Sequence, residues 1–238
     1  MLQKIKPQQF VSFSDKILPL AVLLCLFSLI YGVYQALFIS PPDYQQGESV
    51  RIMYIHVPSA WMSLFVYSLM AAASISFIVW KNPLSAIIGR NAAPIGAAFA
   101  LVALVTGSLW GKPIWGAWWV WDARLTSMLI LFFLYLGYMA IHNAFDNEER
   151  AWKASSIVCI IGFVNVPIIK FSVDWWNTLH QPASIIRADG PAIHSSMLLP
   201  LSLMFSAFFF YFLSILFIRI KTDVTNKKII RQKMRKIR

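Results

Sequence analysis

Tryptophan is concentrated in one short segment of this chain. Five of its 10 Trp residues lie within twelve positions, interspersed with Gly111, Pro113 and Gly116. These breakers predict that the first half of the segment is not a regular helix. Indole rings provide a broad stacking area with little rotamer entropy to lose, so the segment suits a large, flat, apolar ligand with a polar edge, such as a porphyrin or a quinone head group. The five tryptophans are Trp110, Trp115, Trp118, Trp119 and Trp121.

An aromatic belt at the membrane interface is the alternative explanation, because Trp favours the level of the lipid head groups. A belt distributes its residues over many helix ends, however, whereas this chain gathers half of its Trp in one place. Composition leaves both interpretations open and favours a binding surface.

Four histidines could supply metal ligands, although a single His is more often structural. His56 and His180 lie on either side of the Trp-rich segment in sequence, in segments that we expect on the same face of a membrane. Two neutral imidazoles from separate segments can approach a haem iron from opposite faces of the ring. His142 is interpreted as an interfacial residue and His194 as a residue at the start of a helix.

A haem would also bring two propionates, which require cations. Arg51 precedes His56 by five positions and Arg124 follows Asp122 by two, and either guanidinium could hold a carboxylate through two hydrogen bonds. Contact with a phospholipid head group explains either arginine equally well. Asp122 could pair with a cation, orient a histidine ligand from behind, or be exposed to water.

The elements that must position these residues are membrane spans. Apolar residues make up 58% of the 238 and charged residues 13%, against about 45–50% and about 25% in soluble domains. Mean hydropathy is +0.63, which excludes an ordinary soluble domain. Six stretches reach the roughly 20 apolar residues that a spanning helix needs. They are Ile17–Ile39, Val57–Trp80, Ala92–Leu109, Leu125–Ile141, Ala154–Phe171 and Ile193–Ile218.

The Lys and Arg residues are divided unequally between the two sides of the membrane. Sixteen of the 21 lie on the side that carries both termini, whereas the acidic residues divide equally. Cationic loops remain in the cytoplasm, so we predict an all-α integral membrane protein with six transmembrane helices and both termini cytoplasmic. The predicted parts are a cytoplasmic N-terminus (1–16), a membrane domain (17–218) with outward loops 40–56, 110–124 and 172–192, and a basic tail (219–238).

The net charge of +11 is concentrated in that tail, which is typical of a flank near anionic membrane lipid and does not indicate nucleic-acid binding. The two cysteines, Cys25 and Cys159, lie in apolar runs and no C-x-x-C-H motif is present. Neither a disulfide scaffold nor covalent haem attachment is therefore expected. The cytoplasmic loops have no Gly-rich phosphate-binding motif, so any ATP-driven step would need another chain.

The Trp-rich segment, ending in the run WWVWDAR at positions 118–124, resembles the tryptophan-rich motif of the haem-handling membrane proteins of cytochrome c biogenesis. The resemblance continues through RIMYIHVP at 51–58 and DWWNTLHQ at 174–181 and covers nearly the whole chain. Six spans within 238 residues fit the haem exporter protein C family (cytochrome c maturation protein C) of system I and not its longer relatives.

This resemblance implies a non-enzymatic role. It implies that His56 and His180 are axial ligands of haem b and that the segment Trp110–Asp122 holds haem and meets a haem chaperone, cytochrome c maturation protein E. Haem would be bound at the outer (periplasmic) face of the bacterial inner membrane, or at the mitochondrial inner membrane in an organelle. The implied partners are ABC-type ATPase and permease subunits and a very small single-span subunit.

Two other functions remain as alternatives. A haem b subunit of a quinone-linked respiratory enzyme would place its histidine pairs within the spans, whereas His56 and His180 lie at the ends of spans. A permease would carry more polar residues at membrane depth than Gln35 and Asn165, which are the clearest here.

Overall fold

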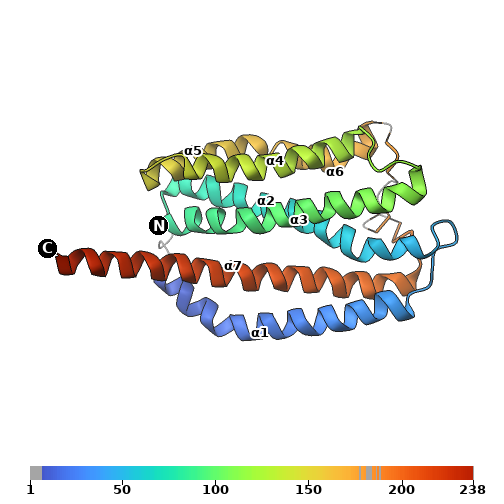
Figure 1. Cartoon of the computed structure of the whole chain (residues 1–238), viewed down its shortest axis with the longest axis horizontal. Helices are drawn as coiled ribbons and strands as arrows, with labels where there is room; N and C mark the ends of the chain where they lie inside the picture. The colour runs from blue at the N-terminus through green and yellow to red at the C-terminus, as the bar shows by residue number, and fades with distance from the viewer. Residues whose placement is uncertain (1–6, 177, 181–183, 186, 188, 238) are drawn as a thin grey trace.

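The computed structural model describes residues 7–176, 178–180, 184–185, 187 and 189–237, and within these residues every regular element is a helix. Residues 1–6 of the predicted N-terminal part, Asn177 and Gln181 of the run DWWNTLHQ, and Arg238 of the tail lie outside this description. The long helices run along one common axis, and both ends of the chain lie at the same end of the bundle (Figure 1).

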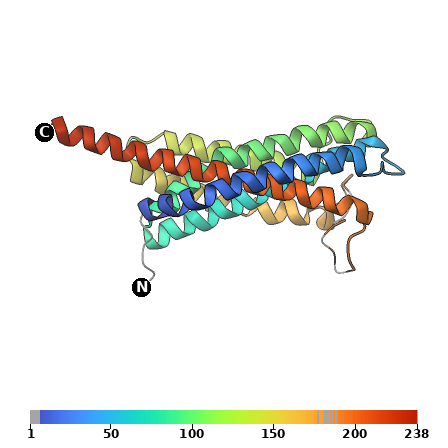
Figure 2. The same ribbon diagram turned by 90° about the horizontal axis from the view of Figure 1, so that it is seen from below.

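Six helical segments are long and apolar enough to cross a membrane, which confirms the predicted number of spans. A turn of π-helix continues the first helix, and a turn of 3-10 helix precedes the second. The elements are α1 (Pro7–Tyr34), η1 (Gln35–Ile39), η2 (Glu48–Ile52), α2 (Met53–Trp80), α3 (Pro83–Trp115), α4 (Ala123–Asn143), α5 (Glu148–Gly162), α6 (Asn165–Trp175) and α7 (Ser195–Ile237). The basic segment after position 218 thus continues α7, which projects beyond the other helices (Figure 2).

The helices α2 to α6 form one packed group, and α7 lies against α2 and α3. The first helix stands apart, because α1 packs along α7 and makes only marginal contact with the others (Figure 1). The thiol of Cys25 donates to the carbonyl of Ala207 at 3.5 Å, and Lys221 pairs with Asp15 at 2.7 Å. Neither Cys25 nor Cys159 forms a disulfide, as predicted.

The core of the packed group lies between α2, α3 and α4. Tyr135 is fully buried, donates to the carbonyl of Ser63 at 2.6 Å, and meets the ring of Tyr67 edge to face at 5.1 Å. A hydrogen bond at membrane depth satisfies groups that lipid cannot, so these contacts fix α4 against α2.

The fifth span is interrupted, because α5 ends at Gly162 and α6 begins at Asn165. Pro167 explains the break, since proline has no N–H to donate and its ring clashes with the carbonyl four residues earlier, here that of Phe163. The Asn165 amide donates to the carbonyl of Ser127 at 2.8 Å and so ties α6 to α4. This hydrogen bond gives Asn165, one of the two polar residues noted at membrane depth, a partner inside the protein.

The prediction of irregular structure at 110–115 was wrong. Helix α3 continues to Trp115 and is capped by Gly116, whose φ of 75° is the left-handed conformation that favours glycine. The Gly116 N–H donates to the carbonyl of Lys112 at 3.1 Å and closes the last turn. Pro113 removes the one hydrogen bond that its missing N–H would donate, and α3 accommodates this loss. The irregular part of the segment is therefore 116–122.

Candidate functional site

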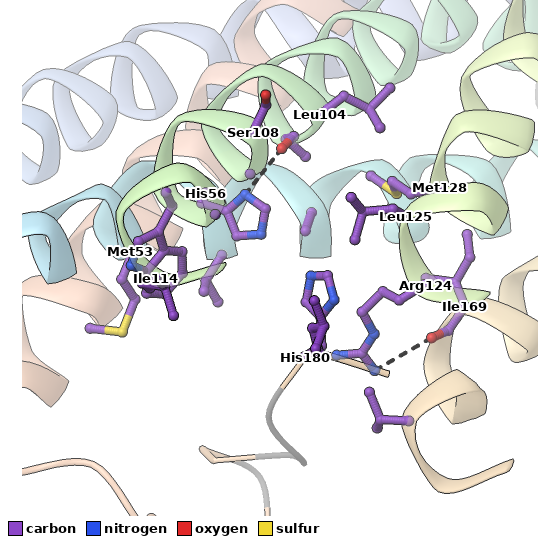
Figure 3. A pocket seen from close by; sticks show the side chains of 18 of the residues that line it. Met53, His56, Leu104, Ser108, Ile114, Arg124, Leu125, Met128, Ile169 and His180 are labelled. Carbon is purple, nitrogen blue, oxygen red and sulfur yellow. Dashed lines mark hydrogen bonds between the residues drawn. The ribbon is translucent and has the colours of Figure 1, made fainter. Parts of the chain in front are cut away.

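A cavity of about 640 Å³ lies at the end of the bundle opposite the chain termini. Helices α2, α3, α4 and α6 line it, together with residues of the segment that follows α6 (Figure 3). Its size falls within the usual range for small-molecule and cofactor sites. Most of its lining is apolar, and its polar groups include both histidines that the sequence singles out.

His56 enters the cavity from the first turn of α2. Its Nδ1 lies 3.0 Å from the carbonyl oxygen of Ala103 and 3.1 Å from Oγ1 of Thr106, both on α3. A carbonyl only accepts, so the proton is on Nδ1 and the lone pair of the neutral ring is on Nε2. Gly107 permits this approach, since a Cβ there would lie 2.9 Å from Cε1 of His56.

His180 enters from the opposite side, from the segment after α6. Its Nδ1 lies 3.1 Å from Oδ2 of Asp122, and the ring of Trp115 lies 4.9 Å away, centroid to centroid. Burial lowers the pKa of His180 below its ordinary 6.5, although Asp122 offsets part of this shift. The ring is therefore neutral at physiological pH, and both imidazoles point into the same cavity (Figure 3).

Asp122 has two structural roles at this site. Its Oδ1 accepts from the N–H of Leu125 at 2.8 Å, which caps the start of α4. Its Oδ2 contacts His180, so one carboxylate links the beginning of α4 to the orientation of an imidazole that comes from a loop. Acceptors of this kind fix the tautomer of metal-binding histidines.

The five tryptophans divide into two groups. Trp110, Trp115 and Trp119 line the cavity, whereas Trp118 and Trp121 are 56% and 74% exposed and are not among the lining residues. The Trp110 ring meets His56 edge to face at 5.6 Å. Its Nε1 donates to Oε1 of Gln46 at 2.9 Å, which anchors the ring from the loop before η2.

The two candidate arginines have different positions. Arg124 lines the cavity and donates through Nε to the hydroxyl of Ser172 at 3.2 Å. Arg51 does not belong to the lining, because its guanidinium binds Glu48 at 2.5 Å and the carbonyl of Ala36.

Sequence reasoning missed Lys170, a cation of α6 that lines the cavity. Its signal was a lone charge within a long apolar run, which is expensive in a membrane and usually functional.

The remaining histidines lie away from the cavity lining. His142 is buried in the last turn of α4, and His194 accepts at Nδ1 from Ser196 just before α7 begins, as predicted for a helix-end residue. The described residues contain no group of three His, Cys, Asp or Glu side chains placed to hold a metal ion. A pair of imidazoles in an aromatic cavity fits an iron that already has four equatorial ligands.

Comparison with known proteins gives a consistent result. A family model described as "Heme exporter protein C" matches residues 1–235. The chain is similar to the Heme exporter protein C of Bradyrhizobium diazoefficiens, with 47% identity over 231 residues that cover 97% of this chain and 86% of the relative. It is 49% identical over 206 residues to a putative cytochrome c biosynthesis ccmC-like mitochondrial protein of Marchantia polymorpha, covering 87% of each chain. The Heme exporter protein C of Haemophilus influenzae is 46% identical over 219 residues, 92% of this chain and 89% of the relative.

Proposed function

Because the chain belongs to the heme exporter protein C family, we propose that it holds haem b between His56 and His180 and delivers it to a haem chaperone during the maturation of c-type cytochromes. The protein is a multi-pass membrane protein of transport and maturation and not an enzyme. Membership of this family argues against the alternative that the chain is a haem b subunit of a quinone-linked respiratory enzyme.

The observation that carries the proposal is the pair of imidazoles in one cavity. Each ring has its Nδ1 held by an oxygen, at Ala103 in one case and at Asp122 in the other, which leaves both Nε2 atoms free to coordinate. Two neutral imidazoles on opposite faces of a porphyrin give low-spin iron. The optical spectrum of the purified chain after addition of haem tests this directly, and a high-spin or unchanged spectrum would contradict it.

Delivery requires a surface that the chaperone can reach. Trp118 and Trp121 are large, exposed aromatic residues beside the cavity, and Trp is enriched among residues that dominate protein interfaces. We assign them to contact with the chaperone, and Trp110, Trp115 and Trp119 to stacking on the porphyrin.

Replacement of the exposed pair should separate holding haem from passing it on. We expect Trp118→Ala with Trp121→Ala to leave haem binding near the wild-type level and to lower holo-chaperone yield several-fold, since two central interface residues cost about 1 kcal/mol or more each. Trp110→Ala is the matched variant of the lining group and should weaken binding itself. Haem is quantified on both proteins after affinity purification. Wild-type delivery by the Trp118→Ala, Trp121→Ala variant would show that these two residues only anchor the protein in the membrane.

The orientation that we propose places both termini in the cytoplasm and the cavity at the outer face of the bacterial inner membrane. It rests on the excess of Lys and Arg at the end that carries the termini. The loops at that end are short, at positions 81–82 and 144–147, so an ATP-driven step falls to separate ABC-type ATPase and permease subunits. A small single-span subunit completes the proposed complex.

Reporter fusions test this orientation. Fusions after Asp43 and Gly116 should be active as periplasmic reporters, and a fusion after Asp146 should be active only as a cytoplasmic reporter. Paired alkaline phosphatase and green fluorescent protein fusions at each site serve as mutual controls. Cytoplasmic fluorescence from the Gly116 fusion would place the cavity on the wrong side for a periplasmic chaperone.

A further inference from the structure

The fifth span changes neighbours at its break. Helix α5 packs against both α2 and α4, whereas α6 packs along α4 and makes only marginal contact with α2. The hydrogen bond from the Asn165 amide to the Ser127 carbonyl holds the start of α6 against α4. Arg124 of α4 holds the rest of α6, because it donates to the carbonyl of Ile169 and to the hydroxyl of Ser172. The half of α2 nearer the cavity is therefore left without a helix on the side where α5 covers its other half.

The cavity has an apolar rim on each of the two helices that separate. The rim on α2 includes Trp61 and Leu64, and the rim on α6 includes Ile169 and Val173. We call the gap between these two rims the lateral slot. Trp61, Leu64 and Val173 are partly exposed although they lie within membrane spans. Trp61 lies about 12 Å along α2, at a rise of 1.5 Å per residue, so the slot is at the depth of the lipid tails.

No other helix of the described residues closes the lateral slot. The ring of Phe205 on α7 meets Trp61 edge to face at 5.6 Å, but α7 has no extensive contact with α6. The described parts of α1, α5 and α7 contribute no residue to the cavity lining. With no helix behind it, the slot faces the bilayer.

The water-facing end of the cavity is covered by two segments instead. Trp119 comes from the segment between α3 and α4, and His180 and Ile185 come from the segment between α6 and α7. All three residues line the cavity, and Ile185 also packs against the buried cluster that contains Met53. A large, flat molecule therefore meets more obstruction from the water than from the side.

We propose that the lateral slot is the entrance of the cavity, through which a flat tetrapyrrole passes edge-on from the outer leaflet of the membrane. This inference rests on the proposed function. A porphyrin has broad apolar faces that favour lipid over water, and its thin edge suits a gap between two helices lined by apolar side chains. The break after Gly162 creates this gap, because α6 follows α4 from there and no longer covers α2.

A haem that cannot leave the membrane tests this assignment. Haem with one propionate esterified to octadecanol keeps its iron and ring, but its tail remains in lipid and has to extend through the slot when the ring is bound. The methyl ester of the same propionate has the same charge and no tail, so it is the matched ligand. The purified full-length chain in phosphatidylcholine vesicles should bind both esters with the same low-spin spectrum, followed by titration at the Soret band.

Two substitutions at the rims should change the two affinities unequally. Val173→Trp narrows the slot and should weaken the octadecyl ester about tenfold relative to the methyl ester, because the tail and the new side chain compete for the same space. Trp61→Ala widens the slot and should shift this ratio in the opposite direction. Val105→Trp makes the first change at an exposed position of α3 outside the cavity lining and should leave the ratio unaltered.

The outcomes are distinct. A wild-type chain that binds the methyl ester but not the octadecyl ester would overturn the inference. Equal effects of Val173→Trp on both esters would also overturn it, since the tail would then leave by the water-facing end, and so would selective weakening of the octadecyl ester by Trp61→Ala. A wild-type chain that gives no low-spin spectrum with either ester or with haem itself would instead contradict the proposed function.

Discussion

Replacement of either His56 or His180 by alanine is expected to remove the low-spin haem spectrum and to leave little haem on the purified protein. In the proposed site each imidazole supplies one of two axial bonds, and among the described residues the cavity lining contains no other histidine. Loss of a group that only orients a metal ligand costs about 10–100-fold in affinity, so loss of the ligand itself should cost more. Soret titration of the purified variants measures the effect.

His194→Ala is the matched control, because His194 lies at the same end of the bundle but bonds Ser196 outside the cavity lining. Its haem spectrum should equal that of the wild type. Normal occupancy with a normal low-spin spectrum in both His56→Ala and His180→Ala would rule out ligation by this pair.

Replacement of Asp122 by asparagine should lower haem affinity about 10–100-fold without unfolding α4. Asparagine is as good a helix cap as aspartate, so its oxygen can still accept from Leu125. Its NH₂ group then faces Nδ1 of His180 and donates to it, which moves the ring proton to Nε2 and blocks coordination. Soret titration and the content of low-spin iron are the measurements.

A capping control separates the two roles of this carboxylate. Asn147 caps α5 at the other end of the bundle through the N–H of Arg150 at 2.9 Å, so Asn147→Ala removes a cap of the same kind far from the cavity. It should cost about 1 kcal/mol of stability and no haem affinity. If Asp122→Asn bound haem like the wild type while Asp122→Ala did not, Asp122 would be a helix cap only.

The spans were predictable because their signal is local. A run of apolar residues identifies a membrane helix without any tertiary information, and the six runs correspond to the six helical segments. Their ends were less predictable. Proline and glycine at 113 and 116 were taken to break the helix from its first Trp. Helix α3 instead contains Pro113 and stops only where Gly116 adopts the left-handed conformation, which the sequence alone does not specify.

The candidate site was predictable in its histidines and less so in its cations. His56 and His180 could be paired because both had to lie at the same face. Arg51 is near His56 in sequence, but a turn of 3-10 helix directs its guanidinium to Glu48, three residues earlier. Lys170 reaches the cavity only because α6 packs on α4, and no sequence pattern specifies which helices become neighbours.

The pairing of α1 with α7 has a consequence for the order in which the protein is made. About 160 residues separate the end of α1 from the start of α7, and chains grow at roughly 5–20 residues per second. The first helix therefore waits on the order of ten seconds or more in the bilayer, with its future contact face against lipid, until the last helix is inserted. A polypeptide released before Ser195 leaves α1 without its main partner. The lipid-exposed contact face of α1 then distinguishes an unfinished chain from a complete one.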